Sequence, residues 1–213
     1  NPIHTLAQRV AQIFVNAAAS PYVMDKHPFR FRLMSEVAKH YGLPIAYCNQ
    51  VGGNDELVFD GASCGFDAAG QIVGHAKAFA EDLLIVDLPV GGDEGSSDSA
   101  TTTAHDTQVF AAAEVSRDHP MVREASQQAV GDFVAVSPQA GRVATYPVGV
   151  AGAYEALVLG LRDYCRKCGF GSIVLGLSGG IDSALTAVLA VMAMGPDQVR
   201  GVSMPSRYSS EGS

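Results

Sequence analysis

Residues 172–183 read Ser-Ile-Val-Leu-Gly-Leu-Ser-Gly-Gly-Ile-Asp-Ser, an apolar run followed at once by a short polar loop. The run over 172–177 is apolar enough to be a strand buried on both faces, as in a parallel sheet. A helix is predicted over 184–194 and a second apolar strand over 199–204. This order predicts a βαβ unit, whose loop lies at the sheet edge where open α/β sheets bind ligands.

The loop has the residues of a phosphate cradle. Gly179 and Gly180 allow a tight turn and a close approach of the backbone to an anion. The N–H groups of the helix start that follows are unpaired, and the helix dipole favours negative charge there. Ser178 and Ser183 add hydroxyl donors. Asp182 repels phosphate, so we expect it to bind a Mg²⁺ ion that neutralises a pyrophosphate.

The pattern lacks the Lys of the P-loop and differs from the Gly-x-Gly-x-x-Gly of dinucleotide folds. A plain alternative is a turn rich in Ser and Gly that Asp182 caps. The flanking strand and helix favour a resemblance to the pyrophosphate loop of the ATP-pyrophosphatase superfamily, whose members activate a carbonyl oxygen by adenylation. The resemblance implies an ATP site made of Gly176, Leu177, Ser178, Gly179, Gly180, Ile181, Asp182 and Ser183.

A further helix is predicted in front of the loop, over 151–168, with Gly169 as its C-cap. Its apolar stripe is expected to consist of Tyr154, Leu157, Val158, Leu161 and Tyr164. Within this helix, Tyr154–Tyr164 resembles the helix before the loop in glutamine-dependent NAD synthetases. Met204–Ser210 is similar to the segment that follows their second strand.

The front of the chain carries an independent resemblance. Asn16–Tyr22, with Lys26-His27 following, and Tyr47–Gly61 look like the later half of a nitrilase-type glutaminase domain. In the NAD synthetases such a domain precedes the synthetase domain. Enzymes that make asparagine or GMP use unrelated glutaminase domains, so the pairing selects the NAD synthetases. The alternative is a carbon–nitrogen hydrolase fused to another ATP-pyrophosphatase.

The expected fold class is α/β. A partial nitrilase-like α-β-β-α sandwich would be followed by the start of an adenine-nucleotide α-hydrolase-like, Rossmann-like domain with a parallel sheet. The first part is expected to hold a helix over 28–40, a turn over 52–55 and strands over 13–16, 43–49, 57–59, 62–66, 72–76 and 83–88. The expected domains are 1–90 for the glutaminase part, 91–150 for connecting structure and 151–213 for the synthetase part. Within the connection, 91–106 is expected to be a flexible linker or surface insertion.

The resemblance implies a reaction in two places. Glutamine is hydrolysed in the nitrilase domain, and its ammonia displaces AMP from adenylated deamido-NAD to give NAD. Ser20 and Lys26 match positions that contact glutamine, and a hydroxyl and a cation suit its amino and carboxylate groups. The glutaminase Glu, Lys and Cys would lie before Asn1, and residues that hold deamido-NAD would lie after Ser213. We therefore expect this stretch to contain no catalytic residue and to lack full activity by itself. Another alternative to the synthetase is a truncated piece with no catalytic role.

The acidic composition of the chain argues against some classes of binding partner. The formal net charge is −8 and the pI about 5.1, so nucleic acid and anionic membranes are poor partners. No apolar run approaches a membrane span, no signal peptide is visible, and four irregularly spaced cysteines do not form a disulfide pattern. A cytoplasmic protein is expected, and the resemblance implies a homo-oligomer.

Several other residues are expected to be structural. Cys48 and Cys64 lie in apolar strands and are predicted to be buried thiols. Cys165 and Cys168 have the spacing of a metal pair but lack nearby further ligands. His27 and His40 are predicted to lie on the surface, and Arg207 is one alternative contact for a phosphate near the loop.

Overall fold

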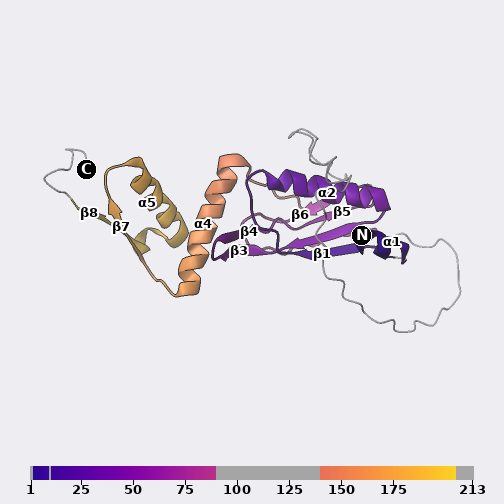
Figure 1. The fold of residues 1–213 in the computed structure, drawn as a ribbon, viewed down its shortest axis with the longest axis horizontal. Helices are drawn as coiled ribbons and strands as arrows, with labels where there is room; N and C mark the ends of the chain where they lie inside the picture. The colour runs from indigo at the N-terminus through magenta and orange to yellow at the C-terminus, as the bar shows by residue number, and fades with distance from the viewer. Residues whose placement is uncertain (1, 10, 90–139, 205–213) are drawn as a thin grey trace.

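The computed structural model describes residues 2–9, 11–89 and 140–204. The first part of the chain builds a mixed sheet, shown in Figure 1 beneath the long helix α2. Its elements are α1 (Pro2–Gln8), β1 (Phe14–Ala18), α2 (Lys26–Tyr41), β2 (Ile45–Asn49), β3 (Val51–Asn54), β4 (Leu57–Asp60), β5 (Cys64–Phe66) and β6 (Ile72–His75). Four strands form one sheet in the order β1-β2-β5-β6, with β1 parallel to β2 and the other pairs antiparallel. Strands β3 and β4 form a separate hairpin.

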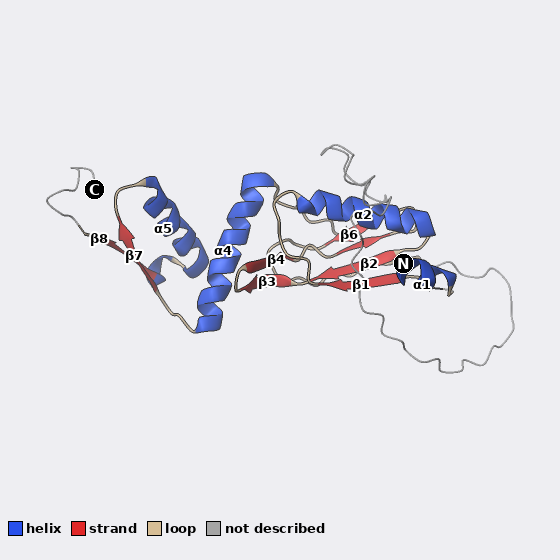
Figure 2. Cartoon of the chain, viewed as in Figure 1, coloured by secondary structure: helices blue, strands red, loops and turns tan. Residues whose placement is uncertain are grey.

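The second part begins with a long helix and ends in the predicted βαβ unit. Its elements are α4 (Gly149–Cys168), β7 (Ile173–Leu177), α5 (Ile181–Met194), the 3-10 turn η1 (Pro196–Gln198) and β8 (Val199–Ser203). Strands β7 and β8 are parallel over five paired positions, which confirms the βαβ prediction. In the cartoon of Figure 2, α4 lies between the β3–β4 hairpin and α5, and it contacts both.

Local signals placed the helix ends well. Gly42 ends α2 in the left-handed conformation at φ 62°, and its N–H donates to the carbonyls of Ala38 and Lys39. Gly169 ends α4 in the same way at φ 73°. Glycine adopts this conformation without the Cβ penalty of other residues, so the predicted C-cap at Gly169 is confirmed and Gly42 ends α2 for the same reason.

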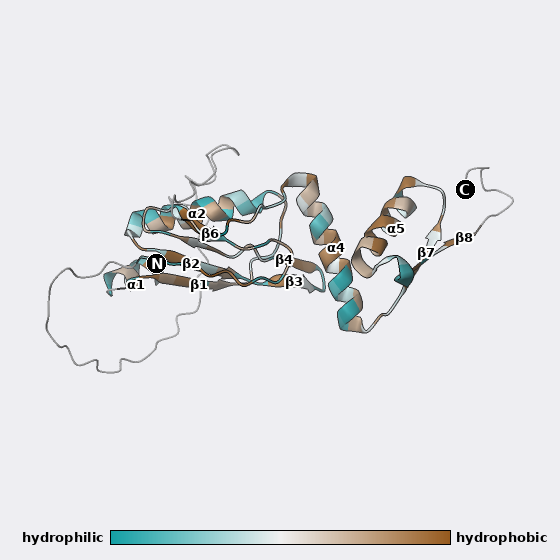
Figure 3. Ribbon diagram, turned by 180° about the vertical axis from the view of Figure 1, so that it is seen from behind, coloured by the Kyte–Doolittle hydropathy of each residue, from teal (hydrophilic) through white to brown (hydrophobic). Residues whose placement is uncertain are grey.

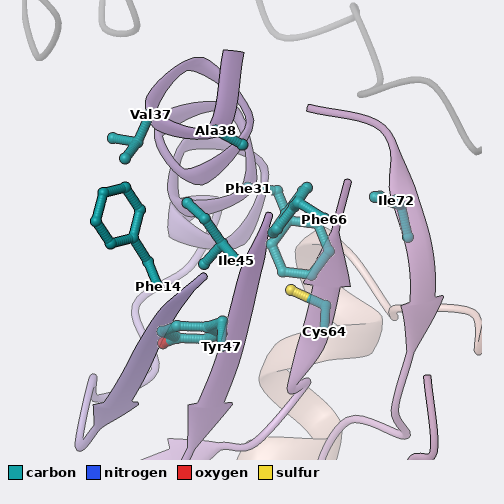
Figure 4. Packing of buried hydrophobic residues seen from close by; sticks show 9 residues of the cluster. All are labelled: Phe14, Phe31, Val37, Ala38, Ile45, Tyr47, Cys64, Phe66 and Ile72. Carbon is teal, nitrogen blue, oxygen red and sulfur yellow. The ribbon is translucent and has the colours of Figure 1, made fainter. Parts of the chain in front are cut away.

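The main core lies between α2 and the four-stranded sheet. Figure 4 shows side chains of both elements meeting there, with Phe31 of α2 above Phe66 of β5. The rings of Phe31 and Phe66 pack edge to face, with centroids 5.6 Å apart. Burying a large apolar side chain stabilises the fold by about 1.5–3 kcal/mol. The buried members are Phe14, Phe31, Val37, Ala38, Ile45, Tyr47, Cys64, Phe66 and Ile72.

The strand predicted over 83–88 is wrong. This segment forms no strand, although its residues alternate between exposed and half-buried. The cause is close packing over two glycines of the neighbouring strands. A Cβ placed on Gly74 would come within 2.4 Å of Val86, and one on Gly65 within 3.1 Å of the same side chain. The segment therefore packs its side chains against β5 and β6 and is not a strand of the sheet.

The edge of β6 pairs instead with a segment predicted only as connecting structure. Gly141 N–H donates to the Val73 carbonyl at 2.9 Å, and His75 N–H donates to the Arg142 carbonyl at 2.9 Å. The turn predicted over 52–55 is also partly wrong, because Gly52 and Gly53 lie within strand β3. The reversal begins at Asn54, and Asp55 takes a left-handed φ of 50°.

The apolar stripe predicted for α4 is only partly correct. Val158 is buried, but Leu157 and Tyr164 are exposed, while Ala156 and Leu159 pack into a second cluster with Phe79. Small residues face the hairpin because the backbones approach closely there. The hydropathy colours of Figure 3 also show that α5 is largely apolar, and several of its side chains are exposed. Within the described ranges, no helix is long and apolar enough to cross a membrane.

Candidate functional sites

The loop between β7 and α5 turns as its two glycines predict. Gly179 has a left-handed φ of 78°, a conformation that glycine adopts without strain. Gly180 is the N-cap of α5 in extended conformation, and no side chain caps the helix. The exposed first turn of α5 therefore leaves N–H groups available to a ligand. This geometry is that of an anion site at a helix start.

Two serine hydroxyls close the loop on itself. Ser183 Oγ donates to the Gly180 carbonyl at 2.9 Å and accepts the backbone N–H of Ser178 at 3.3 Å. The two hydroxyls lie 3.2 Å apart, and the Gly180 N–H donates to Ser178 Oγ at 3.4 Å. These contacts tie the end of β7 to the first turn of α5, so the serines fix the loop in addition to offering donors.

Asp182 is exposed in the first turn of α5. Its carboxylate can supply one ligand to Mg²⁺, which commonly takes one or two protein carboxylates and completes its shell with phosphate oxygens and water. Within residues 2–9, 11–89 and 140–204, no group of three or more His, Cys, Asp or Glu could hold a metal ion. By itself, Asp182 can therefore supply one protein ligand to a cation at this position.

Ser20 and Lys26 lie near the two ends of the connection between β1 and α2. Ser20 is half-buried just beyond the carboxyl end of β1, and Lys26 is the first residue of α2. The Lys26 ammonium donates to the Pro21 carbonyl at 3.2 Å. Burial, and then the nearby Arg30 charge, hold the pKa of Lys26 below its ordinary value.

A buried polar cluster beside these two residues was missed from the sequence. Arg30 donates two hydrogen bonds to Asp60, from Nη1 to Oδ1 at 3.1 Å and from Nη2 to Oδ2 at 2.9 Å. Asp60 also accepts from Asn49 at 3.0 Å and from the Tyr146 hydroxyl at 2.7 Å. One signal was available: Arg30 follows Lys26 by one helical turn and stands between Phe29 and Phe31.

The buried charge of Arg30 is compensated. Burial alone would lower the pKa of its guanidinium, but the hydrogen bonds and negative charge of Asp60 outweigh burial and raise that pKa. The pKa of the Tyr146 hydroxyl is raised as well, but here burial acts in the same direction as Asp60. Burial, and then its hydrogen bond to Asp60, raise the pKa of the Tyr146 hydroxyl well above its usual range. The Asp60 carboxylate therefore accepts hydrogen bonds from the charged guanidinium of Arg30 and from the neutral hydroxyl of Tyr146.

His27 was predicted to lie on the surface, and this prediction is wrong. Its ring stacks on Tyr146 with centroids 3.5 Å apart and is buried. Burial, the Arg30 charge and His75 lower the pKa of His27 to about 2. Its Nδ1 lies 3.3 Å from Arg30 Nη2 and must accept, because a guanidinium only donates. His40 is exposed, as predicted.

Cys48 is exposed, contrary to the prediction of a buried thiol. Successive strand side chains point to opposite faces, and Cys48 stands between the buried Tyr47 and Asn49. Cys64 is buried as predicted, and burial raises the pKa of its thiol well above the usual range. Cys165 is buried and Cys168 exposed. Arg207 and the segment 91–106 lie outside the described residues.

Comparison with known proteins divides the chain in the same two parts. Residues 1–92 match the carbon-nitrogen hydrolase family, and residues 153–213 match the NAD synthase family. The glutamine-dependent NAD(+) synthetase of Synechocystis is 36% identical over 211 residues, 99% of this chain and 30% of that protein. The enzyme of the same name from Thermotoga maritima is 41% identical over 202 residues, 93% of this chain and 33% of that protein.

Solved structures agree. A glutamine-dependent NAD+ synthetase from Acinetobacter baumannii, in complex with ADP, superposes with a TM-score of 0.68 at 32% identity, covering 98% of this chain and 32% of that one. A synthetase from Cytophaga hutchinsonii shares the fold, with a TM-score of 0.58 at 15% identity, covering 96% of this chain and 33% of that one. The chain spans about a third of the length of the relatives that it matches.

The fold is thus a mixed α/β arrangement, in which a segment like the carbon-nitrogen hydrolases is followed by a parallel-sheet segment like the start of the NAD synthase domain. The resemblance to the glutamine-dependent NAD(+) synthetases is confirmed, and a fusion to another ATP-pyrophosphatase is not favoured.

Proposed function

We propose that this chain is part of a glutamine-hydrolysing NAD(+) synthase, a ligase that amidates deamido-NAD. In this reaction ATP adenylates the nicotinate carboxylate, and ammonia from glutamine displaces AMP. The observation that carries the proposal is the joining of a nitrilase-like sheet to the Ser178–Ser183 loop through one helix, α4. Similarity to relatives of that name over nearly the whole chain supports it.

The ATP site is proposed to consist of Gly176–Ser183. The left-handed Gly179, the uncapped start of α5 and the exposed loop support a nucleotide phosphate there. The relative solved with ADP supports an adenine nucleotide as the ligand. Asp182 would hold Mg²⁺ together with phosphate oxygens, and the metal would neutralise charge on the pyrophosphate that leaves.

The glutamine site is proposed to include Ser20 and Lys26. Their place on one connection beyond β1 supports a shared ligand, since the carboxyl ends of parallel strands meet at the same sheet edge. We propose residues 1–90 as the glutaminase part, 91–150 as the connection and 151–213 as the synthetase part. A cytoplasmic homo-oligomer remains part of the proposal, and light scattering of the full-length protein tests the oligomer.

The decisive experiment uses the full-length protein with ATP, Mg²⁺ and deamido-NAD, supplied with either glutamine or ammonia. NAD formation with both nitrogen sources is expected. ATP consumption against another acceptor, without NAD from either source, would keep the nucleotide loop and overturn the named reaction. Complete inactivity in both assays would favour a non-catalytic piece.

A further inference from the structure

The position of Ser20 is set by a side chain from the neighbouring strand. Asn49 Oδ1 accepts the backbone N–H of Ser20 at 2.8 Å, and Asn49 Nδ2 donates to the Ser20 carbonyl at 3.2 Å. Strands β1 and β2 are parallel, with Ala18 opposite Asn49, so Ser20 passes directly over this amide. Asn49 thus holds both polar groups of the Ser20 backbone, just where the sheet hydrogen bonds end.

The orientation of the Asn49 amide is decided by Asp60. The Nδ2 atom of Asn49 lies 3.0 Å from Asp60 Oδ1 and 3.1 Å from the Gly61 carbonyl oxygen. Both of these oxygens can only accept a hydrogen bond. The NH₂ group must therefore face Asp60, which leaves Oδ1 facing the N–H of Ser20. Asp60 is 2% exposed, so water cannot take over this role.

The same carboxylate also holds the beginning of α2. Arg30 makes two hydrogen bonds to Asp60, and Lys26 lies one helical turn before Arg30. The anchored guanidinium fixes that turn against the sheet. Asp60 is therefore bound to both segments that carry the proposed glutamine contacts: to Ser20 through Asn49, and to Lys26 through Arg30.

We propose that Asn49 and Asp60 are positioning residues for glutamine recognition. Asp60 orients the Asn49 amide, and that amide holds Ser20 where its hydroxyl meets the substrate. This inference rests on the proposed function, because it names what prearranges the same glutamine site. The competing explanation is a buried network that stabilises the fold and nothing more, and the two differ in what they do to the KM for glutamine.

The test compares Asn49→Ala with Ser35→Ala in the full-length protein. Ser35 is an equally buried residue of α2 whose hydroxyl donates to the Gly70 carbonyl at 2.7 Å, so its loss removes a similar hydrogen bond without touching Ser20. Asn49→Ala is expected to raise the KM for glutamine about tenfold, the effect of losing about 1.4 kcal/mol of binding. Its NAD formation from ammonia is expected to remain as in the parent.

A double-mutant cycle that combines Asn49→Ala with Ser20→Ala tests whether Asn49 affects glutamine binding through Ser20. Once the Ser20 hydroxyl is gone, removing Asn49 should raise the KM for glutamine less than it does in the parent, because both changes affect one contact. Strictly additive effects on KM would overturn the proposal. So would an unchanged KM in Asn49→Ala, or an equal rise in Ser35→Ala.

Folding and function remain distinguishable in this design. Ammonia-dependent NAD formation reports that each variant is folded and that the synthetase reaction exists. If Asn49→Ala loses this activity too, Asn49→Ser serves instead: its single short hydroxyl cannot bond the N–H and the carbonyl of Ser20 and Asp60 together as the amide does, so its KM for glutamine is expected to rise. A parent protein that makes no NAD from either source would refute the proposed function itself.

Discussion

The backbone N–H of Gly53 donates a 2.8 Å hydrogen bond to the buried Oδ2 of Asp163. The two residues are 110 positions apart, one in the β3–β4 hairpin and one in α4. Lys167, one turn later on α4, reaches the Gly53 carbonyl as well. Both backbone groups of Gly53 are therefore hydrogen-bonded to side chains of α4, which ties the β3–β4 hairpin to that helix.

Replacing Asp163 tests this junction. Asp163→Ala leaves the Gly53 N–H buried without an acceptor, and we expect the free energy of unfolding to fall by about 1–3 kcal/mol. Asp163→Asn keeps a carbonyl oxygen that can accept, so its loss should be smaller. Urea unfolding of the three proteins measures this order, and equal losses for the two variants would contradict it.

The hairpin and α4 also touch through glycines. A Cβ on Gly53 would come within 2.9 Å of Gly160 Cα, which is backbone and cannot rotate away. Gly53→Ala is therefore expected to cost about 1–3 kcal/mol of the free energy of unfolding. Gly171→Ala is the control, because a Cβ there meets nothing within 4 Å. Thermal unfolding of both variants gives the comparison, and an unaltered Gly53→Ala protein would disprove the close contact.

Asp182→Ala tests the proposed nucleotide site. The variant loses the carboxylate expected to hold Mg²⁺, so NAD formation should fall at least about a hundredfold with glutamine and with ammonia alike. Asp197→Ala removes another exposed carboxylate, in η1 beyond the far end of α5, and should keep its activity. An Asp182→Ala protein that still uses ammonia at the parental rate would exclude Asp182 from the reaction.

His27 makes stability depend on pH. Burial lowers the pKa of His27 from 6.5 to about 2 in the folded protein, whereas the unfolded chain keeps the ordinary value. Between these two values only the unfolded state binds the proton, so the stabilisation is complete above pH 6.5 and is lost as the pH falls.

Between the two pKa values of His27, the free energy of unfolding is expected to rise by about 1.4 kcal/mol per pH unit because of this residue. His27→Gln cannot titrate and can still accept from Arg30, so its slope should be smaller by that amount. Burial also lowers the pKa of His75, and both proteins keep that contribution. Urea unfolding at pH 5, 6 and 7 compares them, and parallel curves would mean that His27 does not remain neutral.

Local chemistry explains why much of this protein could be predicted. The helix ends at Gly42 and Gly169 follow from the left-handed conformation that glycine accepts. The loop over 178–183 follows from adjacent glycines between a strand and a helix. In each case the interacting groups lie within a few residues, so their order along the chain already decides the geometry.

Contacts between distant segments were decided only by the tertiary structure. The apolar run over 83–88 indicates a strand but not whether a partner strand or the glycines of β5 and β6 lie beside it. The burial of His27 depends on Tyr146, far along the chain. Asp60 gains its partners from 11, 30 and 86 positions away. A buried charge needs several hydrogen bonds from fixed directions, and only the packed fold brings such donors to one point.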